Sequence, residues 1–296
     1  MLQGKVVIIS GAGAGIGRDF ARAFAAHGAN VVVNDIERPD GTSAAHAVVE
    51  DITASGGRAI AAPASVADRQ AADGIVAVAM DRFGRVDCVV NNAGIVRDRL
   101  IFNMTDEEWR DVIDVHLNGS FNLTRASAPY MKAQGSGSYI FMTSTSGLIG
   151  NVGQANYSAA KMALVGLSKS VALDMARYHI RSNCIAPWAW TSMMASIPAE
   201  TPEQQARVAK LKTMESAKIA PLAVYLASDR SAHVSGQIFG VRANELYLFN
   251  QIRMIRSIHR DGGWTPESIA DTAIPALESS FFENVPASQL TPWDPV

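Results

Sequence analysis

Short apolar runs rich in β-branched residues alternate along this chain with longer segments whose apolar residues recur at helical spacing. The first run, Lys5–Ser10, ends in glycines, and the segment after it, Gly15–His27, also stops at a glycine. Further strands are predicted at residues 31–34, 58–62, 87–91, 139–142, 181–185 and 237–241. Helices are predicted at residues 43–55, 67–83, 105–134 and 216–226. Another predicted helix carries Tyr157 and runs to about residue 178, and a further helix begins at residue 201. Strands separated by helices pair in parallel through right-handed crossovers. The alternation therefore predicts an α/β, doubly wound, Rossmann-type sheet of seven mainly parallel strands with helices on both faces.

Composition limits what such a chain can bind. Of its 296 residues 48% are hydrophobic, and the net charge of −2 comes from well-mixed acidic and basic residues, so no nucleic acid or anionic membrane is expected as a partner. No apolar run reaches the roughly 18 residues that span a bilayer, and the first strand begins too early for a signal peptide. Cys88 and Cys184 lie in strand-like runs and are expected to be reduced, which favours a cytoplasmic location. The six histidines show no metal-ligand spacing, so no metal is expected.

The loop after the first predicted strand is rich in glycine and reads Ser-Gly-Ala-Gly-Ala-Gly-Ile-Gly over residues 10–17. Glycines here let the backbone turn tightly and approach a pyrophosphate, which the free amides of a helix N-terminus bind. The spacing departs from G-x-G-x-x-G, because Ile16 stands at the sixth position from Gly11. A plain turn is the alternative, but the position between a strand and a helix favours a dinucleotide site.

An acidic residue, Asp35, directly follows the second predicted strand. A carboxylate at this place binds the adenosine ribose hydroxyls and repels a 2′-phosphate. The expected cofactor is therefore NAD rather than NADP, although Arg18 is a nearby cation that would favour the phosphate.

Three polar residues between positions 144 and 161 carry the expected chemistry. Tyr157 and Lys161 are four residues apart and share one face of a helix, while Ser144 follows the strand at 139–142. A lysine ammonium lowers the pKa of a neighbouring phenol, which is otherwise a poor base at neutral pH. Tyr157 would then take a proton from an alcohol while a hydride leaves the same carbon, and Ser144 would hold the substrate oxygen. A tyrosine that only packs the helix, beside a surface lysine, is the alternative.

Two stretches with asparagine belong to the same candidate site. The fourth predicted strand ends in Asn91-Asn92-Ala93-Gly94, whose small and polar residues suit either a pocket wall or a turn. Asn118 falls inside a predicted helix, where asparagine has poor propensity. This misfit indicates a bend or a bound water at Asn118, and a solvated surface asparagine is the alternative.

The motifs described above, together with Pro187 and Thr191, follow one another in the order that is typical of the short-chain dehydrogenase/reductase family. The chain resembles this family over about residues 3–241. The resemblance implies that Tyr157 is the acid/base, Lys161 lowers its pKa, Ser144 orients the substrate oxygen and Asn118 holds a water in a proton relay. Ser65 stands where many members have Asp, so the adenine contact is expected from the backbone of Val66. The implied cofactor contacts are Gly11, Gly15, Ile16, Gly17, Asp35, Ser65, Val66, Asn91, Ala93, Gly94, Tyr157, Lys161, Pro187 and Thr191.

Within the family, residues 31–35, 91–99, 150–161 and 219–226 look like the (3R)-hydroxyacyl-CoA dehydrogenase domain of peroxisomal multifunctional enzymes and bacterial relatives. This likeness implies NAD-dependent oxidation of a 3-hydroxyacyl-CoA. A hydroxysteroid or bulky cyclic alcohol is the runner-up substrate, and a non-catalytic dinucleotide sensor is a further alternative. An apolar cluster after the sixth strand predicts an apolar substrate pocket, with core under a lid as the other interpretation. Its members are Trp188, Trp190, Met193, Met194 and Ile197.

The chain continues past the usual end of this fold. We therefore expect a dehydrogenase domain over residues 1–244 and an extension over 245–296 that packs on the same or a neighbouring subunit. An extension that covers the active site, or a loosely attached tail, is the alternative. Within the extension, residues 245–260 are expected to form an extended arm and residues 265–277 a short helix. The family resemblance also implies a homodimer or homotetramer through the helices that carry Asn118 and Tyr157.

Overall fold

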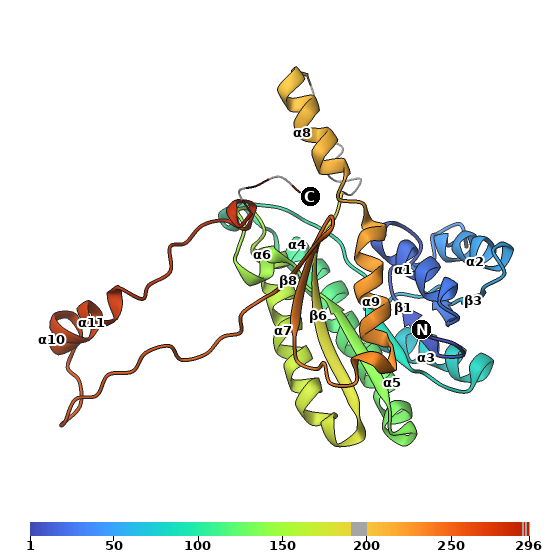
Figure 1. Ribbon diagram of the computed structural model, residues 1–296, viewed down its shortest axis with the longest axis horizontal. Helices are drawn as coiled ribbons and strands as arrows, with labels where there is room; N and C mark the ends of the chain where they lie inside the picture. Colours follow the sequence, from blue (N-terminus) through green and yellow to red (C-terminus); the bar gives the residue numbers. More distant parts are fainter. Residues whose placement is uncertain (191–199, 292, 294, 296) are drawn as a thin grey trace.

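The computed structural model describes residues 1–190, 200–291, 293 and 295. Within these residues, eight strands form one sheet in the order β3-β2-β1-β4-β5-β6-β7-β8 (Figure 1). All neighbours pair in parallel except β7 and β8, which are antiparallel, so the doubly wound arrangement is confirmed. The strands are β1 (Val6–Ile9), β2 (Asn30–Val33), β3 (Arg58–Ala61), β4 (Cys88–Asn91), β5 (Gly137–Met142), β6 (Ile180–Trp188), β7 (Ile238–Arg242) and β8 (Glu245–Leu248).

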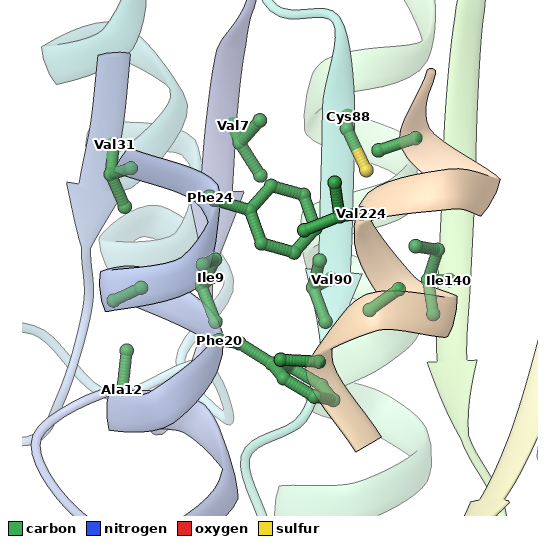
Figure 2. Close-up of a cluster of buried hydrophobic side chains, with 14 of the residues drawn as sticks. Val7, Ile9, Ala12, Phe20, Phe24, Val31, Cys88, Val90, Ile140 and Val224 are labelled. Carbon is green, nitrogen blue, oxygen red and sulfur yellow. The ribbon is translucent and has the colours of Figure 1, made fainter. Parts of the chain in front are cut away.

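Helices cover both faces of this sheet. Successive strand residues point to opposite faces, and both faces are buried, which explains why the central strands are apolar almost throughout. One layer consists of α1 (Gly15–Ala26), α2 (Ala44–Ala54) and α9 (Ala220–Ala227). Figure 2 shows this side, where Phe20 and Phe24 of α1 lie against the sheet. The other layer consists of α3 (Arg69–Phe83), α5 (Gly119–Gln134) and α7 (Ala155–Asp174).

The sheet has one strand more than the seven expected. β8 folds back on β7, with Arg242 opposite Glu245. The turn between the two strands holds Ala243 at φ 51°, in the left-handed region where glycine or asparagine is usual. Because no glycine marks this hairpin, the sequence pattern suggested an extended arm instead. The sheet therefore continues past residue 244, the expected end of the domain.

The helix expected over residues 105–134 is interrupted by a π-helical turn. α4 (Asp106–Ile113) begins with the expected capping box between Thr105 and Glu108. The π-helical turn η2 covers Asp114–Asn118 and leads directly into α5. Such a turn widens the helix by one residue and changes the direction of the side chains around it. A bend near Asn118 was expected, and the π-helical turn decides which neighbouring side chain faces the interior.

The extension leaves the body of the molecule after β8 and later returns to it (Figure 1). At its far end lie the short helices α10 (Pro266–Ser268) and α11 (Ile274–Glu278). The return is fixed where the Ala287 amide donates to the Gly150 carbonyl at 2.9 Å. Of the helices described, α8 (Pro202–Lys212) also projects from the body, and none is long and apolar enough to cross a membrane.

Candidate active site

A cavity of about 800 Å³ lies at the carboxyl ends of the parallel strands, where ligands bind in open α/β sheets. Gly11 after β1, Asp35 after β2 and Asn92 after β4 line one part of it. Tyr157 and Lys161 of α7 line another part. The expected contact residues Gly15, Ile16, Gly17, Ser65, Val66, Ala93, Gly94 and Pro187 also line this cavity.

The glycine-rich loop after β1 is shaped to receive an anionic group. Gly11 and Gly15 have φ of 62° and 51°, which side chains other than glycine rarely adopt. The Asn92 side chain braces the loop by donating to the carbonyls of Ser10 and Gly11, both at 3.0 Å. Ala14, the N-cap of α1, offers no side-chain acceptor to the first helical amides. These amides can therefore bind a pyrophosphate, and the loop fits a dinucleotide.

Gly17→Ala is expected to weaken NAD binding at least about tenfold and to lower the melting temperature. An added Cβ would lie 2.2 Å from the Gly11 carbonyl oxygen and 2.6 Å from Asn92 Nδ2, so the loop must shift. Calorimetric titration with NAD measures the affinity. Gly74→Ala in α3, where nothing lies within 4 Å of the added Cβ, is the matched control. Equal NAD affinity in Gly17→Ala and the wild type would contradict this description of the loop.

Asp35 is held at the rim of the cavity by two backbone amides. Its Oδ2 accepts from Gly13 N at 2.7 Å, and its Oδ1 accepts from Ile36 N at 2.8 Å. Arg18 lines the same cavity, and its guanidinium forms a long ion pair of 3.7 Å with Asp19. The structure thus places a fixed carboxylate and a nearby cation at the same part of the cavity.

The structure brings Ser144, Tyr157 and Lys161 together as the spacing predicts. Ser144 is the N-cap of the short helix α6 (Thr145–Leu148) and hydrogen-bonds with Tyr157. Lys161 Nζ lies 5.5 Å from the centre of the Tyr157 ring and donates to the Met142 carbonyl at 2.6 Å. The oxygen of a bound alcohol or ketone can therefore hydrogen-bond to both the serine hydroxyl and the phenol, while the lysine ammonium lies near the phenol ring.

The pKa of Tyr157 moves opposite to the expected direction. Burial raises it, and the hydrogen bond with Ser144 does not compensate. Burial also lowers the pKa of Lys161 to about 7. The net shift of the Tyr157 pKa is therefore upward because burial has the largest effect, and the influence of Lys161 on this phenol stays a prediction. As a protonated phenol, Tyr157 is set to donate a proton, and its use as a base needs added positive charge nearby.

Two of the expected asparagines do not face the cavity. Asn118 is exposed, and its Nδ2 donates to Asp114 Oδ1 at 2.6 Å. The π-helical turn instead directs the side chain two residues earlier, His116, to the cavity wall. Asn91 is buried, with its amide 3.4 Å from Thr124, while its neighbours Asn92, Ala93 and Gly94 line the cavity.

Of the apolar cluster expected at the end of β6, Trp190 and Trp188 lie in different surroundings. Trp188 packs against Tyr247 and Phe249, with ring centres 5.6 Å and 6.2 Å away, and it does not line the cavity. Trp190 lines the cavity as expected. Thr191, Met193, Met194 and Ile197 lie outside the described residues.

His116 was not expected from the sequence, since a histidine beside Asn118 in a predicted helix gives no signal of its own. Its side chain is 2% exposed. Its Nε2 lies 2.7 Å from the Ile95 carbonyl oxygen, and its ring meets Tyr157 edge-on with centres 5.3 Å apart. Burial and the nearby Lys161 lower the pKa of His116 to about 3.

His116 is expected to make the fold less stable as the pH falls from 6.5 towards 3. In that range the unfolded chain binds a proton at this histidine and the folded chain does not, so the free energy of unfolding falls with pH. The contribution lost at pH 5 is about 2 kcal/mol. Urea unfolding of the wild type and His116→Gln at pH 5 and pH 7 measures it. Identical pH dependence in the two proteins would contradict a neutral buried His116.

Comparison with known proteins agrees with this geometry. Residues 5–202 match the family described as short chain dehydrogenase. The hydroxyacyl-CoA dehydrogenase ChsB1 of Mycobacterium tuberculosis is 39% identical over 284 residues, which are 92% of this chain and 88% of that protein. A crystal structure of a short chain dehydrogenase from Mycobacterium avium has a TM-score of 0.84 and 38% identity, and covers 96% of this chain and 98% of that one.

A peroxisomal hydratase-dehydrogenase-epimerase of Neurospora crassa is 45% identical over 228 residues, 77% of this chain but 24% of that protein. The chain thus spans between 24% and 36% of the length of three peroxisomal relatives that it matches. The family match extends over more than half of the chain, and the solved relative covers nearly all of it. This chain belongs to the short chain dehydrogenase family.

Proposed function

We propose that this protein is an NAD-dependent dehydrogenase that oxidises the secondary hydroxyl of a 3-hydroxyacyl-CoA to a ketone. The observation that carries the proposal is the meeting of Ser144, Tyr157 and Lys161 beside a cavity whose rim holds Asp35. The name of the ChsB1 relative supports the substrate class. The family uses a nicotinamide nucleotide, and the choice of NAD rests on the fixed Asp35 carboxylate.

Each residue of the site has a separate role in the proposed reaction. Ser144 Oγ hydrogen-bonds the substrate oxygen and keeps it near the Tyr157 phenol oxygen. Tyr157 takes the hydroxyl proton as the carbonyl forms, and Lys161 stabilises the phenolate that must exist beforehand. A nicotinamide cofactor held in this cavity would supply the acceptor for the hydride that leaves the substrate carbon, and its oxidised ring would add positive charge to the site. In the reverse direction the phenol donates its proton to the ketone oxygen.

The apolar walls of the cavity support a substrate with an apolar chain. Ile95, Val96, Val115 and Trp190 line it together with the polar groups of the site. Such a cavity also suits a hydroxysteroid or a bulky cyclic alcohol, which is the second candidate substrate class. Trp190 is the observation in its favour, since a planar indole offers a surface for a flat ring.

The test of this function is a panel assay of NADH and NADPH formation. The substrates are (3R)- and (3S)-hydroxyacyl-CoAs, hydroxysteroids and cyclic alcohols, each offered with NAD or NADP. Turnover of an acyl-CoA with NAD is expected. Turnover of steroids or cyclic alcohols alone would overturn the acyl-CoA assignment. NAD binding without turnover of any substrate would support a sensor instead.

We further propose that the protein is a homodimer or homotetramer in which the extension packs on a neighbouring copy. The extension exposes much apolar surface, including Met254 at 96% and Phe282 at 89%. Large exposed apolar side chains that gather into a patch typically mark an interface. Its arginines, among them Arg253 and Arg256, suit the exposed acidic first turn of α4, which holds Asp106 and Glu107.

Replacing Phe281 and Phe282 together with serine is expected to weaken this association at least about tenfold, because two large buried rings would be lost at the interface. Sedimentation velocity over a range of protein concentrations measures the association. The full-length wild type should sediment as a dimer or tetramer. A wild type that remains monomeric at every concentration would contradict the proposal.

We also propose a cytoplasmic location, which the two buried and unpaired cysteines support. Burial raises the pKa of both Cys88 and Cys184 to about 12, so both are thiols at neutral pH. The word peroxisomal in several names describes those relatives.

A further inference from the structure

The residue before Tyr157 has a buried polar side chain that the chemistry proposed above does not use. Asn156 is the second residue of α7 and is 0% exposed. Its Nδ2 donates to two carbonyl oxygens, that of Arg97 at 3.0 Å and that of Glu108 at 2.9 Å. Its Oδ1 accepts from the Tyr157 amide at 2.7 Å. One buried side-chain amide thus joins three segments of backbone.

The three contacts suit an asparagine and no other side chain of its size. Asparagine has two N–H donors on Nδ2 and an acceptor in Oδ1. Two carbonyl oxygens face Nδ2 and one backbone amide faces Oδ1, so a donor meets an acceptor at every contact. A leucine here would leave buried polar groups unpaired, and an aspartate would place a carboxylate oxygen against two carbonyl oxygens. The position therefore requires a neutral side-chain amide.

The first turn of α7 depends on this side chain. The first amides of a helix have no carbonyl partner within the helix. Gln154, the N-cap of α7, donates from its side chain to Asp98 at 2.9 Å and does not cap the helix. Asn156 instead accepts from the Tyr157 amide in this first turn. The backbone position of Tyr157 is therefore set by a side chain that is itself held by α4 and by the loop after β4.

Lys161, one turn further along α7, is held from a different direction. Its Nζ donates to the Met142 carbonyl at 2.6 Å, and its own carbonyl accepts from Thr143 Oγ1 at 2.7 Å. Met142 is the last residue of β5, and Thr143 follows it. Without the contacts of Asn156, Tyr157 could move while Lys161 stays fixed to β5. The distance between the phenol and the lysine thus depends on Asn156.

The same side chain also reaches the wall of the cavity. Arg97 directly follows residues 95 and 96, which line the cavity. An ion pair of 2.7 Å between Arg99 and Glu108 joins the same loop to α4, but the Arg99 side chain is half-exposed, and such pairs contribute little stability. The buried contacts of Asn156 are therefore the stronger link between this loop, α4 and the first turn of α7.

We propose that Asn156 is a positioning residue, which holds the Tyr157 phenol at the distance from Ser144 and Lys161 that proton exchange with the substrate needs. The proposal rests on the dehydrogenase function proposed above. Asn156 does not line the cavity, so it acts through the backbone of Tyr157 and not on the substrate itself.

Two substitutions of Asn156 test the proposal. Asn156→Ala removes all three contacts, and alanine has the highest helix propensity, so α7 does not lose intrinsic stability. The kcat of this variant is expected to fall about 10- to 100-fold, with a smaller change in the KM of the alcohol, because a small displacement of an acid/base is costly. Asn156→Asp, of nearly the same size, is expected to lose at least as much kcat, since its carboxylate faces two carbonyl oxygens.

Asn183→Ala is the matched control. Asn183 lies in β6 and is also 0% exposed. Its side chain donates to the Val234 carbonyl at 2.9 Å and accepts from the Gln237 amide at 3.0 Å, and it does not line the cavity. Loss of these buried hydrogen bonds is expected to lower the melting temperature, as in Asn156→Ala, but to leave kcat unchanged.

Two further readouts do not depend on turnover. The ultraviolet difference spectrum between each protein and its Tyr157→Phe counterpart reports the ionisation of Tyr157 alone. Asn156→Ala is expected to shift the pH at which Tyr157 ionises, and Asn183→Ala is not. In wild-type protein labelled with ¹⁵N-tyrosine, the Tyr157 amide is expected to be protected from exchange with deuterium, although it lies in the first turn of a helix. The signal that is missing from Tyr157→Phe identifies it.

The outcomes separate the two proposals. A lower melting temperature in Asn156→Ala with unchanged kcat and unchanged Tyr157 titration would show a structural role only, and would overturn the positioning role. Equal losses of kcat in Asn156→Ala and Asn183→Ala would overturn it as well. If Asn156→Ala does not fold, the wild type decides, because a Tyr157 amide that exchanges freely contradicts the proposal. An inactive wild type would overturn the proposed function, while the titration and the exchange would still decide on Asn156.

Discussion

Tyr157→Phe is expected to lower kcat about a thousandfold while NAD binds within about twofold of the wild-type affinity, because general acid/base groups contribute about 10²- to 10⁴-fold. In the proposed reaction the Tyr157 phenol, which hydrogen-bonds with Ser144 and lies near Lys161, exchanges a proton with the substrate oxygen. Phenylalanine keeps the ring contact with His116 and removes only the oxygen. The structure of the site is therefore preserved and only its proton carrier is lost.

Single-turnover kinetics and calorimetric titration with NAD measure the two halves of this prediction. Tyr178→Phe, whose ring lies outside the cavity and near Lys132, is the matched control. Its kcat is expected to equal that of the wild type. A Tyr157→Phe protein with more than about a tenth of wild-type kcat would show that another group carries the proton.

The second large effect concerns Asp35. Asp35→Asn is expected to lower the ratio of kcat/KM for NAD to that for NADP at least about a hundredfold. The carboxylate repels a 2′-phosphate and accepts from the ribose hydroxyls, and the amide does neither as well. Asparagine keeps one oxygen acceptor, so it can retain one of the two hydrogen bonds that Asp35 accepts from the amides of Gly13 and Ile36. Arg18, close by, then becomes a favourable partner for the phosphate.

The ratio is measured with one substrate under both cofactors. Asp40→Asn is the matched control, because Asp40 follows the same strand, lies outside the cavity and hydrogen-bonds Thr42. It is expected to leave the ratio unchanged. An unchanged ratio in Asp35→Asn would mean that Asp35 does not choose the cofactor.

Much of the fold could be predicted because its strands are buried on both faces. Runs such as Val6–Ile9 are apolar throughout, and the helices between them end at glycines or at capping residues. The eighth strand was not predicted, because the turn before it is formed by Ala243 and not by a glycine. Local sequence carries no signal for a strand that depends on pairing with β7.

The candidate site could be predicted only where regular geometry links sequence to space. Tyr157 and Lys161 share a face because α7 is a regular helix. Asn118 was misplaced because a π-helical turn breaks that regularity and brings His116 inward instead. The pKa of Tyr157 depends on how deeply the finished fold buries it, which spacing does not reveal.

The most direct test of the central claim follows a hydride from substrate to cofactor. The wild-type protein is mixed with NAD and a (3R)-hydroxyacyl-CoA that carries deuterium on the hydroxyl-bearing carbon, and the reduced cofactor is analysed by mass spectrometry. We predict that deuterium appears in the NADH formed, together with an equal amount of 3-oxoacyl-CoA. NADH without deuterium, or no conversion of the acyl-CoA while NAD is bound, would contradict the proposed dehydrogenase.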